Sequence, residues 1–208
     1  MARADIWPTV GAERTTLAAD LRSLTADQWS TRSLCTDWTV RDVLAHMTAT
    51  AQITPARFVP KLIGSGFSLH RLQARDIDRL TGGSAADTLA GFQAIIGTTT
   101  GPPGPADTML GETIVHSQDI RRPLGIAHHY PPEALIRVAD FYKGSNLILG
   151  TKRRIDGLSL RATDLSWSHG SGPEVTGPML SILMAMTGRK EPLDDLQGDG
   201  VATLRSRP

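Results

Sequence analysis

Apolar residues recur every three or four positions along most of the first 150 residues, which is the pattern of amphipathic helices. Pro55, Pro60 and the Gly64–Gly66 stretch interrupt this pattern, and no clear helix is predicted across them. The expected helices cover about residues 10–24, 40 through at least 47, 69–80, 85–96, 107–121, 131–149 and 176–187.

Two of these helix starts carry their own capping residues. Thr25, followed three residues later by Gln28, has the spacing of a capping box. Thr39 is the expected N-cap of the helix that contains His46, and Asp42 lies in its first turn, where the helix dipole favours a negative charge.

Beyond residue 150 the pattern changes from helical to alternating. Residues 155–163 alternate like a strand, residues 165–167 could pair with it, and residues 201–204 are a candidate last strand. We therefore expect a mainly α protein in two parts. A helical bundle would cover residues 1–150, and a short α+β extension packed on it would cover residues 151–208.

Charge and composition narrow the class of protein. The formal net charge is +1, and the basic residues form no stripe, so binding to nucleic acid is not expected. Cys35 is the only cysteine, which excludes an internal disulfide and suits a reducing compartment. Neither a signal peptide nor an apolar run of membrane-spanning length is present, so we expect a cytoplasmic protein without a membrane partner.

One group of residues could hold a metal ion. Glu112 and His116 are four apart on a predicted helix, so both side chains lie on one face, and helical bundles build internal metal sites in this way. His46, among apolar residues of another helix, could supply a third ligand. Spacing alone leaves two alternatives open, a surface Glu–His pair and a hydrogen-bonded core histidine.

Two longer motifs surround these residues. Cys35 to His46 reads CTDWTVRDVLAH, and Gly111 to Gly125 reads GETIVHSQDIRRPLG. Both resemble blocks of the mycothiol-dependent maleylpyruvate isomerase family, which is part of the DinB-like superfamily. A third similar block runs from Gly177 through Val201.

The resemblance implies a DinB-like four-helix bundle that holds a divalent metal, usually zinc, through His, Glu and His. Carried over by motif, these ligands are His46, Glu112 and His116. It further implies mycothiol as a thiol cosubstrate and an electrophilic small molecule as its partner, in a monomer or homodimer. Because family isomerases are expected to have a larger C-terminal domain, the broader class of thiol S-transferase or isomerase is favoured.

Other residues near the motifs have two interpretations each. Arg121 and Arg122 could bind a substrate carboxylate, or could complement the helix dipole at a C-terminus. Asp119 could support a ligand histidine or could be a surface or capping residue. Cys35 is expected to pack in a loop without a base beside it. Alternative functions are a metal-dependent hydrolase of an amide or ester and a non-catalytic metal-binding protein.

Overall fold

A computed structural model describes residues 5–146 and 149–208. The chain forms two compact units, which meet in sequence between His129 and Tyr130. Each unit has its own set of packed elements. Among the described residues, every helix is too short or too polar to cross a membrane.

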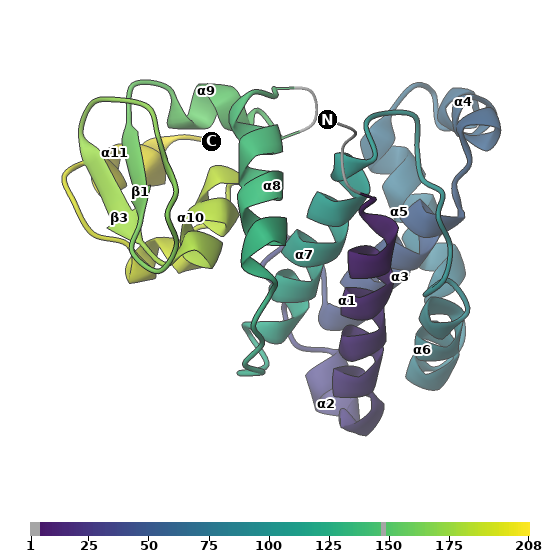
Figure 1. Ribbon diagram of the computed structural model, residues 1–208. Coiled ribbons are helices and arrows are strands. Elements are labelled where there is room, and N and C mark those ends of the chain that lie inside the picture. Colours follow the sequence, from purple (N-terminus) through teal and green to yellow (C-terminus); the bar gives the residue numbers. More distant parts are fainter. Residues whose placement is uncertain (1–4, 147–148) are drawn as a thin grey trace. The chain divides into compact units, whose positions relative to one another are not determined.

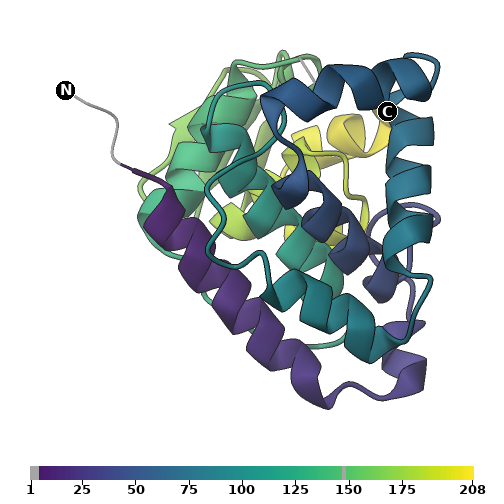
Figure 2. The same cartoon turned by 90° about the vertical axis from the view of Figure 1, so that its right-hand side faces the viewer.

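The first unit contains a four-helix bundle made of α1 (Trp7–Asp20), α3 (Val40–Gln52), α6 (Ala85–Gln93) and α7 (Asp107–Arg121). Helix α1 contacts α6 and α7, and α3 contacts the same two helices, so the four enclose one core. Figure 1 shows α1 beside α7, and Figure 2 shows α1 (purple) beside α6 (teal). The core residues include Leu17, Leu21, Val43, Leu44, Phe92 and Ile120.

Shorter elements connect the bundle helices. A 3-10 turn (Leu21–Ser23) and α2 (Ala26–Trp29) precede α3, and α5 (Leu69–Leu80) packs on α3. Helix α4 (Pro55–Gly64) was not expected, because Pro60 lies inside it. It contains no buried residue, although Phe58, Val59, Leu62 and Ile63 recur at helical spacing.

The second unit joins helices to a small sheet. Its elements are α8 (Pro132–Lys143), α9 (Thr151–Ile155), β1 (Ser159–Ala162), β2 (Ser168–His169), β3 (Glu174–Gly177), α10 (Met179–Met186), a 3-10 turn (Glu191–Asp195) and α11 (Gly200–Ser206). The strand order is β2-β1-β3, with β1 antiparallel to β2 and parallel to β3. Helix α10 packs on β1, β3 and α8, and seven of its residues are buried.

The fold confirms a mainly α bundle followed by a small α+β part and corrects several details. Of residues 155–163 only Ser159–Ala162 form a strand, and Ser168–His169 pair with it in place of residues 165–167. The strand expected at residues 201–204 is wrong, because these residues lie in helix α11. Val201 and Leu204 are three apart and share a helix face, and Leu204 is buried. The helix expected from Thr176 begins at Met179, and β3 precedes it.

The compact units also divide earlier in the chain than residue 150. Helix α8 contacts α9 and α10, so it packs within the second unit. A helical pattern cannot tell which partner a helix packs against, and this is why the sequence placed α8 with the bundle.

Candidate metal centre

Helix α3 places His46 in the bundle interior. The helix begins at a capping box, in which Thr39 Oγ1 accepts from the Asp42 amide at 3.2 Å and Asp42 Oδ2 accepts from the Thr39 amide at 2.9 Å. His46 follows two turns into the helix and is only 7% exposed. The Trp38 ring packs against it, with centroids 4.9 Å apart.

Helix α7 supplies three further polar side chains from one face. Glu112, His116 and Asp119 are at relative positions 0, 4 and 7, so they follow one another along that face. The Asp119 carboxylate is fully buried, and the side chains of Glu112 and His116 are 16% and 13% exposed. Such burial of charged groups is rare unless they pair with one another or bind an ion.

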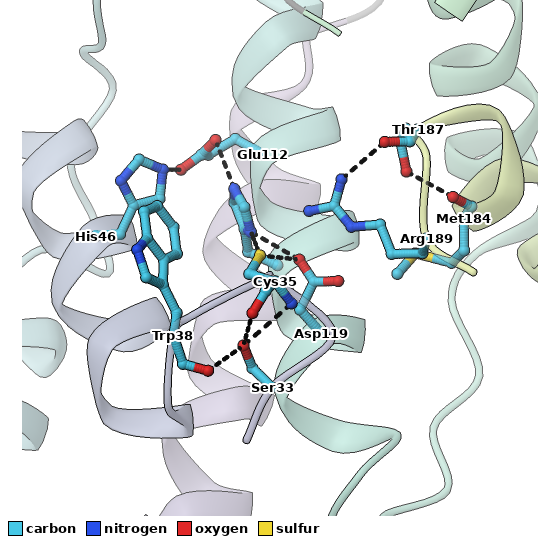
Figure 3. A network of polar contacts seen from close by, with 10 residues as sticks. Ser33, Cys35, Trp38, His46, Glu112, Asp119, Met184, Thr187 and Arg189 are labelled. Carbon is cyan, nitrogen blue, oxygen red and sulfur yellow. Dashed lines mark hydrogen bonds and ion pairs between the residues drawn. The ribbon is translucent and has the colours of Figure 1, made fainter. Parts of the chain in front are cut away.

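The three predicted ligands lie together. His46 Nε2 is 3.1 Å from Glu112 Oε1, and His116 Nε2 is 3.4 Å from Glu112 Oε2. The two imidazole rings lie nearly edge to face, with centroids 4.9 Å apart. One ligand atom from each residue lies within 4.8 Å of the other two, a spacing that could hold one metal ion. Figure 3 shows His46 and Glu112 pointing toward each other.

Glu112 carries a buried negative charge that the two histidines balance. Burial alone would raise the pKa of Glu112, but the attraction of His116 and His46 outweighs it and holds this pKa well below its usual range. Oε1 is buried and, among the described residues, no donor is aligned to make a hydrogen bond with it. A buried carboxylate oxygen without a hydrogen-bond donor can instead be stabilised by a cation, which does not have to present an N–H or O–H group in a particular direction.

Asp119 fixes the orientation of His116. Its Oδ2 lies 2.8 Å from His116 Nδ1, which leaves Nε2 as the ring nitrogen that faces Glu112. Burial alone would lower the pKa of His116, but the Glu112 charge and the hydrogen bonds from Asp119, Cys35 and Glu112 raise it well above its usual value. A carboxylate behind a ligand histidine is the common arrangement in metal sites.

Cys35 does not have the isolated position expected from the sequence. Its Sγ donates to Asp119 Oδ2 at 3.1 Å and lies 3.6 Å from His116 Nδ1. The loop between α2 and α3 folds back to make this possible, because Ser33 Oγ bonds the Cys35 amide and the Trp38 carbonyl (Figure 3). Cys35, His116 and Asp119 thus form a second group of ligand types that uses the other nitrogen of His116.

The two candidate substrate-binding arginines do not share one environment. Arg121 is fully buried, and its guanidinium lies 2.8 Å from Asp20 Oδ2 and 3.9 Å from Glu13 Oε2. The Arg121 guanidinium, held by two carboxylates of α1, therefore links α7 to α1. Arg122 is half-buried and follows the last residue of α7.

The fold and the site together place this chain in a class of proteins, the helical bundles whose interior carries a cluster of two histidines and one glutamate. Residues 10–100 match the family described as the mycothiol maleylpyruvate isomerase N-terminal domain. This match confirms the resemblance for residues 10–100, which contain the first motif block but neither the second nor the third. A comparison with curated protein sequences finds no match.

Two solved structures resemble the chain over nearly its whole length. One is the crystal structure of the mycothiol-dependent maleylpyruvate isomerase, with a TM-score of 0.63 and 14% identity. The other is a histidine-to-alanine mutant of the mycothiol-dependent maleylpyruvate isomerase, with a TM-score of 0.63 and 15% identity. Each likeness covers 93% of this chain and 91% of the other. The expectation that the isomerase has a much larger C-terminal domain is therefore wrong for these structures.

Proposed function

We propose that this chain is a metal-dependent enzyme that uses a low-molecular-weight thiol, mycothiol, to attack an electrophilic small molecule. The reaction class is that of a thiol-dependent isomerase or S-transferase. The observation that carries the proposal is the convergence of His46, Glu112 and His116 from two helices onto one buried point. The family match over residues 10–100 and the likeness to the mycothiol-dependent isomerase structures support the thiol.

The residues present fit a divalent metal ion. Two imidazole nitrogens and one carboxylate oxygen are the donor set of catalytic zinc sites, which keep a further position for a substrate or water. Glu112 Oε1 is a buried acceptor that a cation would satisfy. In this assignment His46, Glu112 and His116 hold the metal. A divalent cation would favour the thiolate over the thiol of a bound cosubstrate.

The surrounding residues prepare the ligands. Asp119 would keep one proton of His116 on Nδ1, so that a metal that displaced the other proton would find the lone pair of Nε2 beside Glu112. Trp38 covers one side of the His46 ring and limits its rotation. Because the attacking sulfur would belong to the cosubstrate, neither a catalytic serine nor a catalytic cysteine of the chain is required.

The test is turnover of maleylpyruvate by zinc-loaded protein with and without mycothiol. We expect turnover only when the thiol is present, and a loss of at least about 100-fold in His46→Ala and Glu112→Gln, since a metal supplies several kcal/mol. His169→Ala, which changes a histidine of the second unit outside the cluster, is the matched control.

Other outcomes would contradict the proposal in distinguishable ways. Hydrolysis of a model ester or amide without any thiol would identify a metal-dependent hydrolase. Bound metal without thiol binding and without turnover of any electrophile in a broad panel would indicate a non-catalytic metal-binding protein.

A further inference from the structure

A second candidate site lies in the unit that begins at Tyr130. A cavity of about 220 Å³ is bordered by two short segments, the start and end of α9 and the residues after α11. Its lining residues are Gly150, Arg153, Arg154, Asp156, Arg207 and Pro208. All of them belong to the second unit, so the cavity is complete within it.

The lining carries a surplus of positive charge. The lining holds three guanidinium groups, those of Arg153, Arg154 and Arg207, and two carboxylates, those of the Asp156 side chain and of the terminal Pro208, so one positive charge is in excess. In the part of the chain that the structure describes, none of the three arginines forms an ion pair with an acidic side chain. Other exposed arginines of this unit do form such pairs, for example Arg161 with Glu174 and Arg205 with Asp194.

Backbone carbonyls hold two of these guanidinium groups in place. Arg154 donates to the carbonyl oxygens of Leu149 and Met186 at 2.9 Å each and to the backbone oxygen of Pro208 at 2.7 Å. Arg207 donates to the carbonyls of Arg154 and Asp156 at 2.6 and 2.7 Å. The internal carbonyls of Leu149, Met186, Arg154 and Asp156 are neutral, so they fix the two guanidinium groups without cancelling their charge. The Pro208 oxygen belongs to the α-carboxylate of the last residue and offsets part of the charge of Arg154.

The backbone at Gly188 leaves room for the Arg154 side chain. Gly188 has a φ of 95°, and a Cβ at this position would lie 3.1 Å from the guanidinium carbon of Arg154. Burial lowers the pKa of Arg154, and repulsion from Arg189 and Arg153 lowers it further. Arg154 thus lies close to two other cations, and an anion that entered would reduce their mutual repulsion.

We propose that this cavity binds a small oxyanion, a phosphate or a carboxylate group, through Arg153, Arg154 and Arg207. Guanidinium groups match the oxygen pairs of both anions and form charge-assisted hydrogen bonds with them. The volume is below the roughly 300–1,000 Å³ of sites for drug-sized ligands. It therefore suits a free anion, or the anionic end of a larger molecule, better than a whole cofactor.

The experiment is isothermal titration calorimetry of the full chain with inorganic phosphate and, separately, with succinate, at low ionic strength. We expect saturable binding of at least one of them at one site per chain. Arg153→Gln and Arg207→Gln should each weaken it about tenfold, the effect of losing one charge-assisted hydrogen bond. Arg153 is exposed, and its side chain makes no hydrogen bond with the described residues, so R153Q removes charge without disturbing the fold.

Arg161→Gln is the matched control, because it removes an exposed arginine of the same unit that lies outside the cavity. The control should bind within about twofold of the unaltered chain, and circular dichroism checks that every variant is folded. Binding of phosphate alone would assign a phosphate site, and binding of succinate alone a carboxylate site. No saturable binding, or equal binding by R153Q, R207Q and the unaltered chain, would overturn the proposal.

Discussion

Asp119 is the residue on which the orientation of His116 depends, because its Oδ2 lies 2.8 Å from the ring Nδ1. Asp119→Asn keeps the size of the side chain and removes its charge. We expect this change to weaken zinc binding about 10- to 100-fold, as the loss of a carboxylate behind a ligand histidine does. Competition with a chromophoric chelator measures the affinity.

The exposed Asp78 of α5 provides the control for this change. Asp78→Asn should leave the zinc affinity unaltered, since this carboxylate is exposed and outside both ligand groups. Equal affinities of D119N and the unaltered chain would mean that Asp119 does not support the metal.

The charge state of His116 predicts how metal binding depends on pH. In the metal-free protein the pKa of His116 is raised well above its usual value by Glu112, Asp119 and Cys35, which outweigh burial. At neutral pH its imidazole is therefore protonated, and a metal must displace that proton. The apparent zinc affinity should fall about tenfold for each unit by which the pH is lowered below the raised pKa.

Zinc titrations at several pH values between 6 and 8 test this dependence. His116→Ala, in which the displaced proton is missing, should bind weakly and lose most of the slope. An affinity of the unaltered chain that is constant over this range would show that His116 is not a ligand.

At the scale of single residues, the sequence indicated the candidate metal ligands and offered Asp119 as a support, but it did not place Cys35 beside them. Glu112 and His116 are close in sequence, and their spacing on a helix is enough to place them together. The position of Cys35 beside His116 and Asp119 depends on a loop that meets α7 some 80 residues later, with no local pattern to announce it. Only the fold determines such contacts.

Among the elements, α3 depends on its N-terminal cap. Thr39 Oγ1 accepts from the Asp42 amide, and Asp42 Oδ2 in turn accepts from the Thr39 amide and hydroxyl, so Thr39 takes part in every bond of this cap. Thr39→Ala should lower the free energy of unfolding by about 1 kcal/mol. Urea denaturation measures it, with the exposed mid-helix Thr15→Ala as a control that should change stability little or raise it slightly.

The T39A variant also tests whether the position of His46 depends on the N-terminal cap of α3. Because His46 lies beyond the first turn of α3, the frayed end should not abolish zinc binding. A wild-type stability in T39A would contradict the role of this cap.

Helices α1 and α7 are joined by a buried ion pair between Arg121 and Asp20. Arg121→Met should cost about 3 kcal/mol or more, because it leaves the carboxylates of Glu13 and Asp20 without this cation. Arg161→Gln, which breaks an exposed pair, should cost less than about 1 kcal/mol. If R121M were as stable as the unaltered chain but lost thiol-dependent activity, Arg121 would act on the substrate instead.

Helices with apolar residues at helical spacing and clear ends were predictable, whereas a helix interrupted by proline and a strand paired with a distant segment were not. The predicted range 107–121 coincides with α7, and 69–80 with α5, because each has apolar residues at helical spacing and a clear end. Helix α4 has Pro60 in its interior, which spoke against a helix, and strand β3 is defined by its parallel pairing with β1, although β2 lies between the two in sequence. Pairing between distant segments leaves no local trace in four residues.

At the scale of the whole molecule, the family match and the candidate metal centre cover different parts of the chain. Residues 10–100 match the family, and they include His46 but not Glu112 or His116. The fold supplies the connection, since α7 packs against α3 in the four-helix bundle and brings both remaining ligands to His46. The metal-binding claim therefore rests on the arrangement of the bundle.

The metal content of the purified, untagged chain tests this claim most directly. Elemental analysis of the unaltered chain, His46→Ala, Glu112→Ala and His116→Ala, with His169→Ala as control, compares all three ligands at once. We predict about one zinc or other divalent ion per chain in the unaltered protein and the control, and loss of most of it in the other three. No metal in the unaltered chain after reconstitution, or full retention in the three variants, would contradict the proposed site.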